Sequence, residues 1–296
     1  MNIDVATAWP DLAQRMGEWS ALLDRSSSND PTLSPLWLEP WWQVFGPDDG
    51  RALRSITVDR GGRLIGLAPL LVRPYRHRGV VPVRRVELLG SGEAEEDEIC
   101  SDYLNVIAEA GKEPLVARAV VRALIDGAIG SWDELCLDYL DRAAPMTGAL
   151  IRQLERAGCR VEIAPRGQCL YTPLPNDWDT LLKQLSSDGR YLARRALRDL
   201  GKWAGDEIEL VQAESTEDLA RGRDILIDLH GQRWGAAGRP GGVFASTRFT
   251  AFHDRVMPAL LERGALDLLW LVCKGEPVAA VYNVVWNGKV YFYQSG

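Results

Sequence analysis

The final stretch of the chain, residues 265–296, constrains the fold more than any other part of the sequence. It contains three apolar runs of residues that pack well on a pleated surface, namely Leu266–Cys273, Pro277–Trp286 and Lys289–Gln294. The runs are separated by Lys274-Gly275-Glu276 and by Asn287-Gly288, and Asn-Gly favours a tight hairpin because both residues tolerate positive φ. The stretch predicts a three-stranded antiparallel meander whose middle strand is covered on both faces.

Composition and charge narrow the class of protein. With 296 residues the chain is long enough for two domains, and its net charge of −7 gives no general reason for binding nucleic acid or an anionic membrane. No apolar run approaches the ~20 residues that span a bilayer, and the N-terminus lacks the apolar core of a secretory signal. We therefore expect a cytoplasmic protein with no membrane span and no nucleic-acid partner.

Cysteine and histidine are arranged in ways that argue against a metal site. The five cysteines are scattered without a CxxC pair, and the three histidines lack the spacing of metal ligands. Acidic residues gather in one loop, residues 91–98, where a divalent-cation site is the alternative to a solvated loop. The solvated loop is favoured because neighbouring carboxylates in a run rarely converge on one ion. No metal is expected.

Strands and helices alternate in the first half of the chain, which is typical of an α/β fold with a mixed sheet. The pattern predicts strands at 53–58, 64–72, 85–89, 103–107, 132–139, 160–163 and 168–174, and helices at 9–23, 35–45, 114–129 and 146–157. Pro173–Asp177 indicates a domain junction, which divides the chain into residues 1–172 and residues 173–296. In the second domain three helices precede the meander, at 178–204, 216–234 and 249–263. The first is expected to be interrupted near Ser186–Gly189, and the second to begin with a capping box formed by Ser215 and Asp218.

The two halves of the chain share a weak internal sequence similarity. The hairpin of residues 58–70, VDRGGRLIGLAPL, aligns with residues 272–284, VCKGEPVAAVYNV, so that Gly61 falls on Gly275. Two copies of one α/β unit would explain the match, although two unrelated hairpins could also resemble each other this well. If the copies are real, the second continues past residue 296 and is incomplete here; the alternative is a complete domain that ends in an edge strand.

Several segments together resemble a known family. They are SPLWLEPWW, IGLAPLLV and SDYLNV in the first half, then YTPLPNDWDTLLKQLSSDGRYLARRALRDL, LIDLHGQRWGAAG and VAAVYNVVWNGKVYFYQSG. The chain resembles the GNAT-fold acyltransferases of the branch named after cellulose biosynthesis (CelD/BcsL-like), relatives of the Fem-type peptidyltransferases. The resemblance covers nearly the whole chain, and it implies tandem GNAT-like units, each with a mainly antiparallel sheet flanked by helices.

The resemblance also implies an activity. Members use acetyl-CoA or another acyl-CoA as co-substrate, and backbone N–H groups at the end of the fourth strand of the fold polarise the thioester carbonyl. Residues 290–294 correspond to that strand. The loop and helix N-terminus that hold the CoA pyrophosphate would follow Gly296, so we expect them outside this sequence and expect no acetyl-CoA binding by the 296-residue chain.

Two functional classes remain open. The first is an N- or O-acyltransferase acting on a small-molecule or sugar-linked acceptor in polysaccharide or cell-envelope biosynthesis. The second is a non-catalytic GNAT remnant that serves as a binding or scaffold module. The exposed edge of the last strand further predicts self-association of the chain.

A basic stripe is the first candidate site. Arg190, Arg194, Arg198 and Lys202 recur every four residues along one predicted helix, with Arg195 beside them. Guanidinium groups in this arrangement suit a phosphate or another anionic substrate, while the alternative is a solvated helix face. Arg190, Arg194 and Arg195 are therefore candidate substrate-binding residues.

The second candidate site combines a helix end with the last strand. His230 is a candidate general base because its pKa lies near neutrality, and Arg233 and Trp234 on the same face are candidate substrate contacts. A lone histidine that caps or packs against the helix is the alternative. On the strand, Tyr291 and Tyr293 are candidate catalytic residues, and the candidate cofactor-binding residues are Phe292, Gln294 and Ser295.

Overall fold

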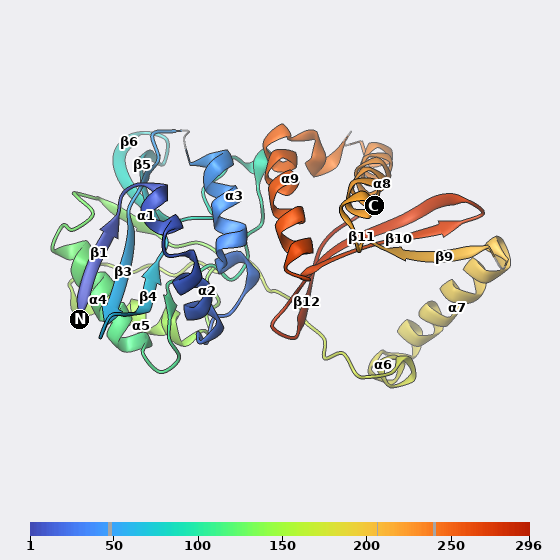
Figure 1. Cartoon of the computed structure of the whole chain (residues 1–296), viewed down its shortest axis with the longest axis horizontal. Helices are drawn as coiled ribbons and strands as arrows, with labels where there is room; N and C mark the ends of the chain where they lie inside the picture. Colours follow the sequence, from blue (N-terminus) through green and yellow to red (C-terminus); the bar gives the residue numbers. More distant parts are fainter. Residues whose placement is uncertain (47–48, 206, 239–240) are drawn as a thin grey trace. The chain divides into compact units, whose positions relative to one another are not determined.

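The chain builds two units, and neither is continuous in sequence. The computed structural model describes residues 1–46, 49–205, 207–238 and 241–296 (Figure 1). Unit 1 consists of Met1–Ile163, Val243–Leu266 and Val284–Tyr291, whereas unit 2 consists of Ala164–Gly242, Asp267–Asn283 and Phe292–Gly296. The predicted boundary at residues 172/173 stays a prediction. The fold class is confirmed as mixed α/β, with several sheets flanked by helices.

Unit 1 holds most of the helices and two of the sheets. Its helices are α1 (Trp9–Ala13), α2 (Met16–Asp24), α3 (Pro35–Phe45), α4 (Glu113–Ile125), α5 (Pro145–Arg156) and α9 (Thr247–Glu262). Its strands are β1 (Asn2–Ala6), β2 (Ala52–Leu53), β3 (Ser55–Arg60), β4 (Arg63–Ala68), β5 (Leu70–His77), β6 (Val81–Leu88), β7 (Ile107–Ala108) and β8 (Glu134–Cys136). The sheet orders are β1-β3-β4-β7 and β2-β5-β6-β8, and only Pro69 separates β4 from β5.

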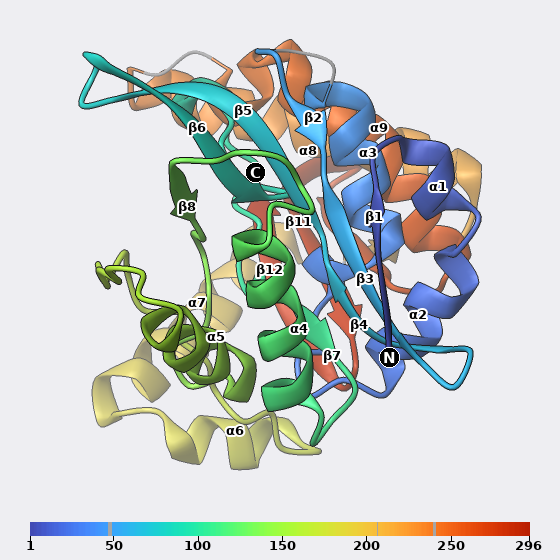
Figure 2. The ribbon, with the colours of Figure 1, turned by 90° about the vertical axis from the view of Figure 1, so that its left-hand side faces the viewer.

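Helix packing in unit 1 depends on one close approach and on aromatic contacts. Helix α4 crosses β3 and β4 and lies beside α5 (Figure 2), and a Cβ at Gly66 would come within 2.4 Å of Val116 Cγ1. Glycine at that position therefore lets helix and sheet meet closely. On another side α3 packs against α9, where Trp37 meets Phe252 edge to face at 5.0 Å between ring centroids. Both side chains are fully buried.

The C-terminal sheet confirms the predicted meander. Its strands are β9 (Ile208–Gln212), β10 (Leu266–Cys273), β11 (Glu276–Trp286) and β12 (Lys289–Ser295), in the order β12-β11-β10-β9. The Asn287-Gly288 turn has the predicted backbone, with φ of 48° and 72°. Lys274 and Gly275 also have positive φ, 55° and 82°, whereas Glu276 belongs to β11 and not to the turn. Two positive φ values in a two-residue turn match the right-handed twist of the flanking strands.

Coverage of the middle strand differs from the prediction. On one face of β11 the residues Ala280, Tyr282 and Val284 are buried; on the other face Asn283 is buried, whereas Ala279 and Val285 are exposed. The strand is therefore covered along one face and only in part along the other, so the prediction that both faces are covered is confirmed only in part for the described residues. Strand β12 lies at the edge of the sheet with Val290 and Phe292 exposed, and self-association through it stays a prediction.

The predicted strands at 160–163 and 168–174 are wrong. Residues 159–175 have no regular secondary structure, and Ile163, Leu170, Tyr171 and Leu174 are all exposed. An apolar run of this length becomes a strand only when a neighbouring strand completes its hydrogen bonds, and none does so among the described residues. This segment leads from α5 to the helices of unit 2.

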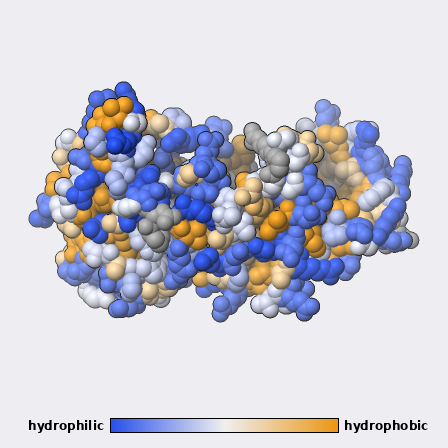
Figure 3. Space-filling view, turned by 90° about the horizontal axis from the view of Figure 1, so that it is seen from above, coloured by the Kyte–Doolittle hydropathy of each residue, from blue (hydrophilic) through white to orange (hydrophobic). Residues whose placement is uncertain are grey.

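Unit 2 contains α6 (Trp178–Gln184), α7 (Ser187–Ala204) and α8 (Thr216–Ala236). The break between α6 and α7 confirms the interruption expected near Ser186, whose side chain accepts a hydrogen bond from Gly189 N at 3.1 Å. Among the described residues, no helix is long and apolar enough to cross a membrane. On the face seen in Figure 3, hydrophobic side chains form separate patches among hydrophilic ones.

Candidate functional site at the end of strand β12

Helix α8 is fixed at its start and along one face. Ser215 Oγ accepts from Asp218 N at 3.1 Å, and the Asp218 carboxylate accepts from Ser215 N at 3.1 Å, which confirms the predicted capping box. The buried face carries Leu219, Gly222, Leu226 and His230. A Cβ at Gly222 would lie 2.7 Å from Trp270 Cζ3, so this glycine allows α8 to pack closely on β10. His230 therefore lies on the packed side of the helix.

Strand β12 contains one residue more than its partner near its end. The two-residue turn places Trp286 opposite Lys289, and further along Ala280 and Gly296 exchange both backbone hydrogen bonds, at 3.1 and 2.9 Å. Six positions separate Trp286 from Ala280, whereas seven separate Lys289 from Gly296. The additional residue makes a β-bulge, a feature that is frequent beside active sites and redirects the backbone groups around it.

His230 binds the backbone at this irregular end of β12. Its Nδ1 lies 2.9 Å from the Ser295 carbonyl oxygen, and because a carbonyl can only accept, Nδ1 carries the proton. Burial lowers the pKa of His230, and the nearby charge of Arg233 lowers it further, although the bond to Ser295 opposes both effects. His230 is therefore neutral at neutral pH. Its Nε2 faces Gly242, where a Cβ would lie only 2.4 Å from this nitrogen.

Arg233 and Trp234 complete the cluster. Arg233 Nη1 donates to Ser295 Oγ at 3.0 Å, and the rings of His230 and Trp234 lie 5.9 Å apart. The structure thus brings together four of the predicted site residues, from the end of α8 and the end of β12. The positions of His230, Arg233 and Trp234 on one helix face were predictable. The hydrogen-bond partner of His230, the Ser295 carbonyl oxygen, was not, because every residue has a main-chain carbonyl and the sequence does not show which one is used.

The other predicted residues of β12 have different surroundings. Tyr293 packs against the buried Tyr282 at 5.1 Å between ring centroids, Gln294 is half-buried and Phe292 is exposed. Tyr291 belongs to unit 1, where its hydroxyl donates to Asp30 Oδ1 at 2.5 Å. Burial and this bond raise the pKa of Tyr291 well above its usual range, so the phenol stays protonated. The catalytic roles of Tyr291 and Tyr293 stay predictions.

The basic stripe lies apart from this cluster. Figure 1 shows α7 beyond β9, away from α8 and from the end of β12. Arg194 and Arg195 are exposed and Arg190 is half-buried; Arg190 Nη1 donates to the Leu185 carbonyl oxygen at 2.6 Å, and Arg195 pairs with Asp199 at 3.2 Å. The two arginines with these contacts help to order their own helix. Substrate binding by the stripe stays a prediction.

The acidic loop of unit 1 is less solvated than its sequence suggests. Glu93 accepts from Trp41 Nε1 at 2.5 Å, Asp97 accepts from Ser246 Oγ at 2.5 Å, and Glu98 accepts from the Tyr139 hydroxyl. Burial raises the pKa of Glu93 to about 7. Glu95 and Glu96 are exposed, so the interpretation as a solvated loop holds for them alone. The described residues include no group of His, Cys, Asp or Glu able to hold a metal ion.

Comparisons with known proteins agree with this architecture. Residues 187–296 match the family model described as an acetyltransferase (GNAT) domain. Among solved structures, one titled "Crystal structure of FemX" is similar, with a TM-score of 0.51 and 15% sequence identity. The match covers 92% of this chain but only 57% of the FemX chain, so at this identity it shows a shared fold over part of that protein. No curated protein sequence matches the chain.

Proposed function

We propose that the chain is an acyl-CoA-dependent N- or O-acyltransferase of the GNAT type. The match of residues 187–296 to the acetyltransferase (GNAT) domain carries this proposal, and the mixed α/β architecture supports it. The acceptor would be a small-molecule or sugar-linked amine or hydroxyl, acylated in the cytoplasm for polysaccharide or cell-envelope synthesis. The proposed arrangement is an N-terminal GNAT-like domain, residues 1–172, followed by an acetyltransferase domain, residues 173–296.

The cluster at the end of β12 suits direct transfer. In that reaction an acceptor nitrogen or oxygen attacks the thioester carbonyl, the C–S bond breaks, and the CoA thiol leaves with a proton. Hydrogen-bond donors of the bulged strand would stabilise the developing oxyanion, and a neutral imidazole is suited to take the acceptor's proton. His230 is neutral, and Arg233 Nη1 donates to Ser295 Oγ beside it. Movement of the backbone at Gly242 away from His230 would give the acceptor access to Nε2.

A second candidate function is a binding module without catalysis. It is favoured by the burial of His230, of which only 1% of the surface is exposed, and by its bond to the Ser295 carbonyl oxygen. A histidine engaged in this way can serve solely to fix the end of the strand against α8. Under this proposal the His230 cluster orders a ligand-binding surface and transfers nothing.

The test measures release of the CoA thiol from acetyl-CoA with a panel of amino sugars as acceptors, together with calorimetric titration of acetyl-CoA. We expect acceptor-dependent thiol release that falls about 100-fold in His230→Gln, the effect of losing a general base. His77→Gln is the matched control, because His77 is partly exposed in unit 1 and its ring contacts Glu134. Binding without turnover would favour the binding module. The sequence-based expectation that residues 1–296 bind no acetyl-CoA is the opposite outcome, and the titration decides between the two. The absence of both binding and turnover would agree with that expectation and contradict acyl-CoA dependence of this chain.

A further inference from the structure

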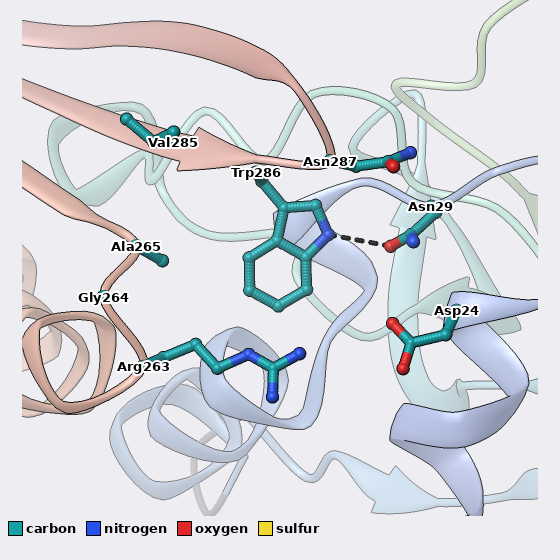
Figure 4. A pocket seen from close by; sticks show the side chains of 8 residues that line it. All are labelled: Asp24, Asn29, Arg263, Gly264, Ala265, Val285, Trp286 and Asn287. Atoms are coloured by element: carbon teal, nitrogen blue, oxygen red, sulfur yellow. Dashed lines mark hydrogen bonds between the residues drawn. The ribbon is translucent and has the colours of Figure 1, made fainter.

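Unit 1 contains a pocket that the acyltransferase proposal does not use. It has a volume of about 200 Å³ and is formed where α2, the loop after it, the end of α9 and the end of β11 meet (Figure 4). The residues that line it with polar or aromatic groups are Asp24, Asn29, Arg263, Trp286 and Asn287. All of them belong to unit 1. The pocket is large enough for one small ring and too small for an extended chain.

Trp286 provides a fixed aromatic surface in this pocket. Its Nε1 donates to Asn29 Oδ1 at 2.7 Å, and the Arg263 guanidinium lies 5.6 Å from the ring centroid. Figure 4 shows the indole standing between Arg263 on one side and Asn29 and Asp24 on the other. Because Nε1 has a hydrogen-bond partner and the Arg263 guanidinium lies over the ring, the indole keeps its orientation without a ligand. A preorganised aromatic face lowers the entropic cost of binding.

The polar groups around the ring determine the class of ligand. The Asp24 carboxylate only accepts hydrogen bonds, the Arg263 guanidinium only donates them, and the amide of Asn287 does both. Asn29 Oδ1 is occupied by Trp286, which leaves its amide N–H groups to donate. An anion would be repelled by Asp24 and a cation by Arg263. A neutral ligand whose neighbouring hydroxyls both donate and accept suits all four groups.

We propose that this pocket binds a single neutral sugar ring, either a hexopyranose or an N-acetylated hexosamine. The C–H face of such a ring packs on an indole, and its adjacent hydroxyls span a carboxylate and a guanidinium. The proposal does not depend on acyl transfer, because none of the lining residues belongs to the His230 cluster. Its failure and the failure of the proposed function are therefore separate outcomes.

Saturation-transfer NMR with methyl β-D-glucopyranoside and with N-acetylglucosamine tests the proposal on the whole chain. We expect transfer from protein to at least one sugar, and about a tenfold weaker affinity in Asp24→Asn and Arg263→Gln, the usual effect of losing one charge-assisted hydrogen bond. Arg255→Gln is the control, because Arg255 is exposed on the same helix and donates to the Ala251 carbonyl oxygen at 2.7 Å. Trp286→Phe keeps an aromatic face and provides a second variant if another variant fails to fold.

Three results would overturn the proposal. They are the absence of transfer to either sugar, equal affinity in the wild-type chain and in folded Asp24→Asn and Arg263→Gln, and binding of sodium acetate in place of both sugars. The last result would make the pocket an anion site governed by Arg263. Circular dichroism and thermal unfolding of each variant confirm that the chain is folded before any loss of binding is interpreted.

Discussion

Tryptophans on helix α3 of unit 1 and on helices α6 and α7 of unit 2 differ sharply in their surroundings. In unit 1, Trp37 and Trp41 on α3 are buried, with 1% and 0% of their surface exposed. In unit 2, Trp178 on α6 and Trp203 on α7 are about half exposed, at 50% and 52%. Both α3 and α7 are helices with aromatic residues on one face, so the local pattern is similar. The difference shows that amphipathic spacing predicts a helix but not the element that will cover it.

The largest expected difference between the units is the change in unfolding free energy when one tryptophan is removed from each. Trp37→Ala leaves a cavity, breaks the 3.0 Å bond from Nε1 to Ser101 Oγ, and should lower the free energy of unfolding by about 3–5 kcal/mol. Trp203→Ala removes a side chain whose ring lies 5.3 Å from Lys274 Nζ, and should cost less than about 1 kcal/mol. Urea unfolding measures both. Similar losses for the two variants would mean that α7 is covered in solution.

Two titrating groups give the units opposite pH dependence. Burial raises the pKa of Glu93 in unit 1 from 4.5 to about 7, so the folded chain retains a proton that the unfolded chain releases. The contribution of Glu93 to the free energy of unfolding is fully present below pH 4.5 and is lost as the pH rises to about 7. The pKa of His230 in unit 2 is lowered from 6.5, so stability from its neutral form is lost as the pH falls below that value.

Glu93→Gln and His230→Gln separate these two effects. We expect Glu93→Gln to remove a decrease of about 3 kcal/mol in unfolding free energy between acid and neutral pH, while the amide still accepts from Trp41. We expect the unfolding free energy of His230→Gln to depend less on pH than that of the wild-type chain at pH values below the usual pKa of histidine. Denaturant unfolding across the pH range measures both slopes. An unchanged slope in Glu93→Gln would mean that another group titrates in unit 1.

The smallest expected effect on stability is at the basic stripe of unit 2. Arg190→Ala together with Arg194→Ala should change the unfolding free energy by less than about 0.5 kcal/mol per site, because Arg194 is exposed and Arg190 is only half-buried. The double variant should nevertheless bind a sugar phosphate or CoA more weakly, if the stripe contacts an anionic ligand. Calorimetry with each ligand measures this difference. Equal affinity in both proteins would leave the stripe as a solvated helix face.

Local signals predicted the parts of the fold that neighbouring residues determine. The Asn287-Gly288 turn, the capping box at Ser215 and the meander follow from side chains a few positions apart. The failures are of another kind: residues 160–174 have strand-like composition but no neighbouring strand, and coverage of β11 depends on distant elements. In the site, helix spacing placed His230 near Arg233 and Trp234. The bulge in β12 required comparing two paired strands, which a single sequence does not show.

The division of unit 1 among three stretches of sequence affects how it can fold during synthesis. Its early residues Trp37 and Asp30 meet partners that the ribosome adds much later, since Phe252 follows Trp37 by more than two hundred positions and Tyr291 follows Asp30 similarly. Contacts between such distant residues form slowly because a long loop must first close. The contacts of the N-terminal core with α9 and with the hairpin of β11 and β12 therefore form only after those segments are made, and a nascent chain exposes its aromatic helix α3 until then.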